Sequence, residues 1–159
     1  MNWLGWLVWG FAATVVLTAL MAGSQGLGLT RMSLPYLLGT LFTPDRDRAK
    51  VLGIGLHLLN GWAFSLVYVA AFHARGRAGA AFGALIGVVH AAFVLTVALP
   101  ALPGLHPRMA SPQHGPTVVR QLEPPGFLAL HYGARTPLSV LLAHAVFGAL
   151  LGLLYRLPG

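Results

Sequence analysis

Four long apolar segments alternate with more polar loops along the chain. Residues 3–22, 51–72, 79–100 and 137–155 contain no Asp, Glu, Lys or Arg. A helix needs about 20 apolar residues to cross the hydrocarbon core of a bilayer, and a charge at its centre costs at least about 2.5 kcal/mol. Helices also satisfy their own backbone hydrogen bonds in lipid. The pattern therefore predicts an all-α integral membrane protein, a single domain over residues 1–159 with four transmembrane helices.

The two longest loops carry apolar stretches of their own. Residues 32–42 and 123–133 are mostly apolar but are interrupted by proline and glycine, for example at Pro35 and Gly39. They are too short to cross a bilayer and too apolar to prefer water. We expect both to form short interfacial or re-entrant segments.

The two halves of the chain share a pattern that predicts an internal repeat. Residues 16–18 (VLT) recur as residues 94–96, and an Arg-Met pair follows in each half. The spacing His-x3-Gly-x6-Tyr also occurs twice, at His57, Gly61 and Tyr68 and again at His144, Gly148 and Tyr155. This order predicts two tandem hairpins, about residues 1–73 and 79–159, related by a pseudo-twofold axis along the membrane normal. The alternative is an up-down bundle without symmetry.

Composition supports the membrane assignment and excludes several classes of protein. Charged residues make up only 8% of the chain, and cysteine is absent, whereas a soluble domain carries about 25% charged residues. This excludes a soluble enzyme core, a disulfide scaffold and a disordered tail. The net charge of +7 is spread over juxtamembrane loops and forms no basic stripe, so no nucleic-acid partner is expected.

The charges are divided unequally between the two ends of the predicted bundle. We call the end with both chain termini side A and the end with loops 23–50 and 101–136 side B. Three basic residues fall on side A and seven on side B, together with all three acids. The positive-inside rule then predicts a multi-pass protein of the cell inner membrane, with the two side B loops cytoplasmic and both termini outside. Interfacial aromatic anchors are expected at side A, from Trp3, Trp6, Trp9 and Tyr155.

Three histidines inside the predicted spans are the leading candidates for a binding site. At 1.5 Å per residue, His57 and His144 lie at matched depth, about 10 Å below side B, and His90 lies about 5 Å deeper. A neutral imidazole binds a haem iron, a metal ion or a quinone oxygen, or it hydrogen-bonds a neighbouring helix. One hypothesis is therefore a cofactor site for haem b or a divalent metal at His57, His144 and His90. The alternative is that each histidine only joins two helices.

The side B loops contain a second set of candidate residues. Arg31 and Arg108 occupy matching places in the two halves, and one hypothesis is that they bind an anion such as a lipid phosphate. Simple anchoring in lipid headgroups is the alternative for these two arginines. A mixed metal site is a weaker hypothesis; its ligands would come from His106, His114, His131, Asp45, Asp47, Glu123, Met32 and Met109. Asp45 and Asp47, which follow Pro44, also fit the N-terminus of the second long helix.

Four loop motifs carry a resemblance to a known kind of protein. They are residues 31–35 (RMSLP), 43–50 (TPDRDRAK), 106–110 (HPRMA) and 121–127 (QLEPPGF). Together they resemble the small four-helix inner-membrane proteins of bacteria, a family with no assigned function. The resemblance implies the four-helix fold but no activity, cofactor or site residue.

The sequence favours a non-catalytic function. It has no nucleophile elbow, no cysteine nucleophile and a single glutamate, so a hydrolytic mechanism is not expected. The main expectation is an accessory subunit or a small binder or carrier of lipid, metal or solute. Its partners would be membrane lipid and other membrane subunits or a second copy. The alternative is a redox membrane protein that holds haem b or quinone through its intramembrane histidines.

Overall fold

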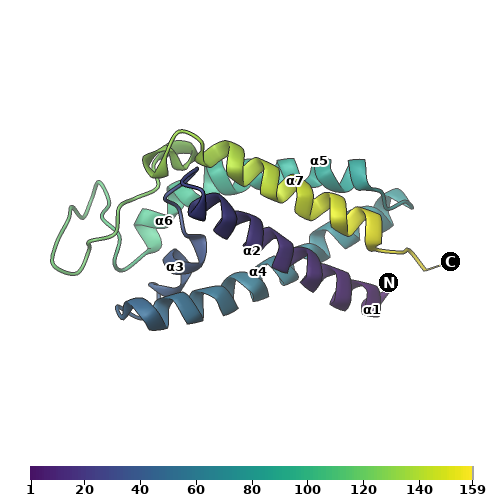
Figure 1. The fold of residues 1–159 in the computed structure, drawn as a ribbon, viewed down its shortest axis with the longest axis horizontal. Helices are drawn as coiled ribbons and strands as arrows, with labels where there is room; N and C mark the ends of the chain where they lie inside the picture. Colours follow the sequence, from purple (N-terminus) through teal and green to yellow (C-terminus); the bar gives the residue numbers. More distant parts are fainter. Residues whose placement is uncertain (159) are drawn as a thin grey trace.

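The computed structural model describes residues 1–158, which are all-helical and contain no strand. Four helices are long and apolar enough to cross a membrane: Trp3–Gly26, Arg46–Arg75, Ala80–Leu105 and Thr136–Leu154. Both termini lie at one end of the bundle and the two long loops lie at the other (Figure 1). The four-helix architecture and the grouping of loops into sides A and B are thus confirmed.

Two of the four long helices contain a π-helical turn. The first consists of α1 (Trp3–Gly5), the π-helical η1 (Trp6–Gly10) and α2 (Phe11–Gly26); the third consists of α5 (Ala80–Phe93), the π-helical η2 (Val94–Ala98) and α6 (Leu99–Leu105). The second and fourth are the uninterrupted helices α4 (Arg46–Arg75) and α7 (Thr136–Leu154).

Each long loop on side B contains one short helix. These are α3 (Leu34–Gly39) and the 3₁₀-helix η3 (Phe127–Tyr132). They coincide with the two apolar loop stretches found in the sequence. Ser33 caps α3, where its hydroxyl accepts a hydrogen bond from the backbone N–H of Tyr36, and Pro35 in the first turn needs no hydrogen-bond partner for its nitrogen.

The helices extend beyond the apolar segments that predicted them. α4 begins at Arg46 rather than at residue 51, because the Asp45 carboxylate caps it and accepts a hydrogen bond from the backbone N–H of Arg48 at 2.8 Å. The predicted capping role of Asp45 is confirmed. The third helix continues through Pro100 to Leu105, because proline is tolerated in the first turn of α6, directly after the wider π-helical turn.

Glycines bring the backbones of α5 and α7 into direct contact. A Cβ atom at Gly83 would overlap the carbonyl oxygen of Gly148, and one at Gly148 would overlap that of Gly83. One turn further towards side B, a Cβ at Gly87 would overlap the carbonyl oxygen of His144. Small residues at four-residue spacing allow this close approach, which is the common way for helices to associate in lipid.

The first hairpin packs differently from the second. α2 and α4 meet where Gly61 faces Thr14 and where the rings of Trp6 and Trp62 stack with centroids 5.2 Å apart. Towards side B the two helices separate, and α3 fills the space between them (Figure 1). α3 is pressed so closely onto α4 that a Cβ at Gly39 would overlap the carbonyl oxygen of Ala49.

The expected aromatic belt on side A is only partly present. Tyr155 is buried, and its hydroxyl accepts a hydrogen bond from the backbone N–H of Asn2 at 3.1 Å and also bonds His73 Nε2 at 2.9 Å. Trp6 is half-buried against the core and donates from Nε1 to Ser65 Oγ at 2.8 Å. The prediction of an interfacial anchor is therefore wrong for Tyr155, because its hydroxyl finds partners within the protein. Trp3 and Trp9 are exposed.

We expect substitution at the α5–α7 contact to destabilise the protein strongly. Gly83→Ala should lower the free energy of unfolding by about 1 to 3 kcal/mol, the usual cost of overpacking, because the new methyl group meets a backbone carbonyl. Gly55→Ala on α4 is the matched control, since nothing lies within 4 Å of its new Cβ. Thermal unfolding in detergent measures both variants, and equal midpoints would contradict the contact.

Candidate functional site

The three histidine candidates of the apolar segments come from three helices, and two of their rings are in contact. His90 on α5 meets His144 on α7 edge to face, with ring centroids 4.9 Å apart. Phe64 stacks on the other side of His90 at 4.8 Å. His57 on α4 and His144 are both only 5% exposed. The contact of His90 with His144 follows from Gly87, which lets the α5 backbone reach the carbonyl of His144.

Hydrogen bonds at Nδ1 assign the tautomers of His57 and His144. The Thr18 hydroxyl donates to the carbonyl of Thr14 at 2.8 Å, so it must accept from His57 Nδ1 at 3.0 Å. His144 Nδ1 lies 2.9 Å from the carbonyl oxygen of Val140 and therefore carries a proton as well. In a neutral imidazole the other nitrogen is then an acceptor. Both Nε2 atoms thus present a lone pair, and within residues 1–158 no donor satisfies either one.

This arrangement resembles part of a metal-ligand set but does not complete one. A metal-binding histidine usually donates its second ring N–H to a carbonyl or hydroxyl group, as His57 and His144 do. No group of three or more His, Asp or Glu side chains in the described residues 1–158 is placed to hold a metal ion. The third histidine, His90, instead bonds the Tyr68 hydroxyl through Nδ1 at 3.0 Å.

The loop residues proposed as mixed metal ligands have separate partners. His106 Nε2 lies 3.0 Å from the carbonyl oxygen of Leu37, and burial lowers the pKa of His106. His131 Nδ1 bonds the carbonyl oxygen of Pro124 at 2.9 Å. These histidines therefore hold the side B loops together, and the described residues do not bring them to a shared point.

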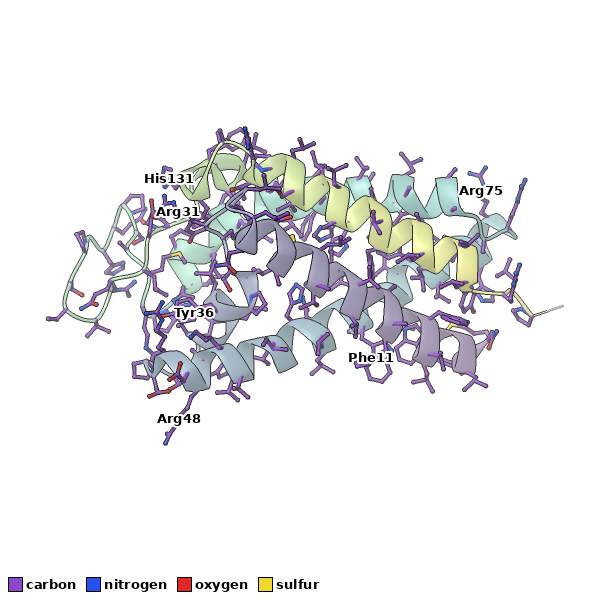
Figure 2. The ribbon with its side chains drawn as sticks, viewed as in Figure 1. Phe11, Arg31, Tyr36, Arg48, Arg75 and His131 are labelled. Atoms are coloured by element: carbon purple, nitrogen blue, oxygen red, sulfur yellow. The ribbon has the colours of Figure 1, made fainter. Side chains whose placement is uncertain are left out.

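A polar cleft on side B contains Arg31, one of the two arginines predicted to bind an anion. Its volume is about 410 Å³. The cleft lies where the α2–α3 connection, the start of α4 and the loop before η3 meet. Figure 2 shows Arg31 and Tyr36 at this end of the bundle, near His131. The lining residues are Gln25, Arg31, Ser33, Tyr36, Leu37, Arg46, Lys50, Leu122, Glu123 and Tyr132.

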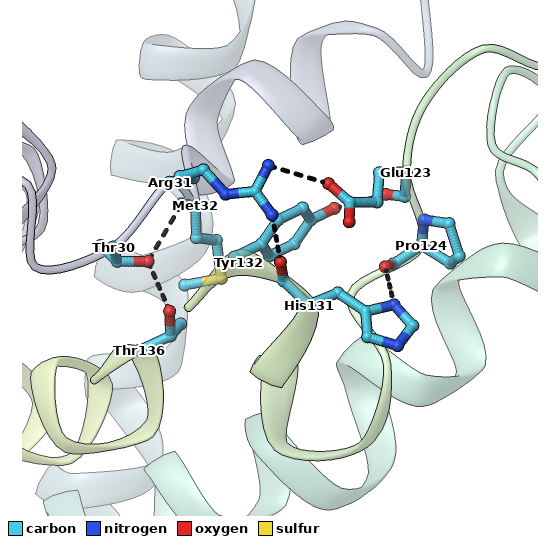
Figure 3. Close-up of polar contacts among 8 residues, drawn as sticks. All are labelled: Thr30, Arg31, Met32, Glu123, Pro124, His131, Tyr132 and Thr136. Carbon is cyan, nitrogen blue, oxygen red and sulfur yellow. Dashed lines mark hydrogen bonds and ion pairs between the residues drawn. The ribbon is translucent and has the colours of Figure 1, made fainter. Parts of the chain in front are cut away.

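The Arg31 guanidinium is held by the loop before α7 (Figure 3). It forms an ion pair with Glu123 at 3.3 Å and donates to the carbonyl oxygen of His131. The Tyr132 hydroxyl donates to the backbone oxygen of Glu123 at 2.6 Å. Burial and the neighbouring Glu123 raise the pKa of Tyr132 to about 12, so this phenol remains a hydrogen-bond donor at neutral pH.

An apolar cavity of about 250 Å³ adjoins the polar cleft between α2, α3 and α4. The two share four residues, which are Gln25, Ser33, Tyr36 and Lys50. The remaining lining is almost entirely apolar, from Thr18, Met21, Ala22, Met32, Leu34, Pro35 and Ile54. A cleft lined by cations and a mostly apolar cavity thus lie side by side.

Arg108 lies in a different cleft from Arg31. Its Nη1 atom donates to the carbonyl oxygens of Thr40 at 2.5 Å and Leu41 at 3.3 Å. It lines a cleft of about 380 Å³ that meets the first one at Tyr36 and Leu122. The structure therefore does not bring Arg31 and Arg108 together, and Arg108 stabilises the chain just after α3.

Two features of the site were missed in the sequence. Arg46 and Lys50 were counted only for their charge, but their four-residue spacing places both on one face of α4 and hence in the cleft. The glycines at positions 79, 83 and 87 and at 148 and 152 carry a helix-packing signal that predicts the α5–α7 contact. No sequence pattern pairs Arg31 with Glu123, because their contact joins two separate loops.

Comparison with known protein families, characterised proteins and solved structures finds no match to this chain. The functional argument therefore rests on the site itself.

Proposed function

We propose that this chain is a non-catalytic membrane protein that binds a lipid with an anionic headgroup at side B, as a small carrier or as an accessory subunit. The observation that carries the proposal is that the cationic cleft adjoins the apolar cavity and shares four lining residues with it. An amphiphile needs both: cations for a phosphate and an apolar space for a chain.

Membrane insertion is supported by the outer surface of the bundle. Large apolar side chains that point away from the core are widely exposed on all four long helices, including Leu4, Leu59, Val89 and Leu153. A soluble monomer rarely exposes apolar patches of such extent. In a bilayer these side chains would contact lipid, and other membrane subunits or a second copy of the chain are the further partners that could cover them.

The tandem repeat is supported by matched burial in α4 and α7. When His57 is aligned with His144, six buried positions coincide. They are Ala49, Gly53, His57, Gly61, Ser65 and Tyr68 in the first half and Thr136, Val140, His144, Gly148, Gly152 and Tyr155 in the second. We propose that the two hairpins descend from one unit and are related by an axis along the membrane normal. The closer packing of α5 on α7 would then be a later difference between them.

The lipid fits the site with its phosphate in the cleft and one chain in the cavity. Arg31, Arg46 and Lys50 surround the cleft, and basic pockets on the cytoplasmic side of membrane proteins bind anionic headgroups. Tyr36 and Lys50 are among the residues that line both spaces. We propose that side B faces the cytoplasm, as the seven basic residues on that side favour.

The proposed orientation is tested by cysteine labelling, because the chain has no cysteine of its own. We expect a membrane-impermeant maleimide to label Pro158→Cys in spheroplasts and to label Gln113→Cys only after the inner membrane is opened. Both positions are exposed in the structure. The reverse pattern would contradict the orientation, and labelling of both in sealed spheroplasts would contradict membrane insertion.

Lipid binding is tested by native mass spectrometry of the detergent-purified chain titrated with phosphatidylglycerol. Loss of one charge-assisted contact in Arg31→Gln should weaken binding about tenfold. Ala22→Trp should weaken it independently by filling the apolar cavity. Arg77→Gln is the matched control, since it removes an exposed cation on side A. If both site variants bind as the control does, the lipid is not bound at this site.

A redox function is the second candidate, and it is favoured by the unsatisfied Nε2 atoms of His57 and His144. Haem iron or a quinol hydroxyl would each satisfy such a lone pair. A Soret band in the visible spectrum of the purified protein, lost in His57→Ala or His144→Ala but kept in His73→Ala, would be expected for haem. A colourless protein that contains no iron and no extractable quinone would exclude this candidate.

A further inference from the structure

We infer that the Glu123 carboxylate occupies the headgroup position when the site is empty, and that this competition favours lipids with a net negative headgroup over neutral ones. The inference rests on the proposed lipid site and adds its charge selectivity. It concerns a residue that neither the charge pattern nor the predicted anion site singled out.

The position of Glu123 within the cleft carries the inference. Among the lining residues, three are cations (Arg31, Arg46 and Lys50) and Glu123 is the one carboxylate. Its oxygen lies 3.3 Å from Arg31 Nη1, which is the contact that a phosphate oxygen would make. A carboxylate and a phosphate cannot both take this place on the guanidinium, so a bound headgroup must displace Glu123.

The backbone around Glu123 allows the side chain to leave without moving the loop. The Tyr132 hydroxyl holds the backbone oxygen of Glu123 at 2.6 Å, and His131 Nδ1 holds that of Pro124 at 2.9 Å. The Glu123 side chain itself is 48% exposed, so it can rotate into water. Displacement therefore costs one exposed ion pair and leaves the fold unchanged.

An incoming lipid must offset the free energy that is lost when the Arg31–Glu123 ion pair breaks. An exposed pair contributes only a small free energy, equivalent to about a threefold change in affinity. Phosphatidylethanolamine has a neutral headgroup whose ammonium group is repelled by the three cations, so it gains little from replacing Glu123. Phosphatidylglycerol brings one net negative charge, and phosphatidic acid, a phosphate monoester, brings about 1.5 to 2. The site should therefore prefer headgroups in the order of their negative charge.

The charge-neutral variant Glu123→Gln tests the competition. It keeps the backbone oxygen that Tyr132 binds and removes only the competing charge. We expect native mass spectrometry of the full chain to show about threefold tighter binding of phosphatidylglycerol. For phosphatidic acid with the same chains the gain should be about tenfold, since the removed repulsion acts on nearly twice the charge. Binding of phosphatidylethanolamine should not tighten.

Asp47→Asn is the control for a general loss of negative charge on side B. Asp47 pairs with the cleft residue Lys50 at the same distance of 3.3 Å, but its own side chain is 91% exposed and does not line the cleft, so it does not occupy the place of a bound headgroup. The control should change the affinity for each lipid by less than about twofold.

The outcomes separate this inference from the lipid site. Weaker binding of phosphatidylethanolamine by Glu123→Gln would show that Glu123 binds the ammonium group, which overturns the competition. Unchanged affinities for all three lipids would overturn it as well. If Arg31→Gln still weakens binding in that case, the proposed lipid site itself stands. If the wild-type chain binds none of the three lipids, the proposed function itself fails.

Discussion

Where α5 and α7 meet at Gly83 and Gly148, two helix backbones touch without side chains between them. Helices in lipid gain little from burying apolar side chains against each other, since lipid is equally apolar, so close backbone packing supplies much of the attraction. This contact determines the second hairpin and the position of His90 against His144. The first hairpin has no series of glycine contacts of this kind between α2 and α4, where Gly61 faces the Thr14 side chain.

The separation of α2 from α4 towards side B follows from this difference in packing between the two hairpins. The two helices are held together near side A by Trp6, Trp62 and the Gly61–Thr14 contact, and they separate towards side B. α3 enters the gap and is fixed to α4 at Gly39 and Ala49. It fills the gap only in part, and the remaining space is the apolar cavity beside the cationic cleft. The candidate lipid site is thus a consequence of unequal packing in two hairpins of similar pattern.

Polar groups in this protein have two different roles: some bond other parts of the chain, and others remain able to bind a ligand. Some join segments that are far apart in the sequence: the Tyr155 hydroxyl bonds Asn2 and His73, and Thr30 bonds Thr136 at 2.7 Å. Two groups have a remaining capacity to bind a ligand, namely the Nε2 atoms of His57 and His144 and the cations around Arg31. The first group belongs to side chains that are only 5% exposed, whereas the second is open to side B and adjoins a cavity. This difference in access is why the lipid site is the stronger functional proposal.

Much of the fold could be predicted from the sequence, because it depends on local properties. Helix length and apolarity predict the four long helices, Asp45 predicts the start of α4, and the proline-interrupted apolar stretches predict α3 and η3. In each case the deciding interactions lie within a few residues of one another.

Other features were decided only by the tertiary structure. Tyr155 looked like an interfacial anchor but is buried, because the chain start brings it a hydrogen-bond partner. Arg31 and Arg108 occupy matching places in the sequence, yet one pairs with Glu123 and the other caps α3. The sequence determined which segments are helices and which residues carry charge. Only the packing of distant segments decided which charges meet and where a cavity remains, since these depend on contacts between residues far apart in the chain.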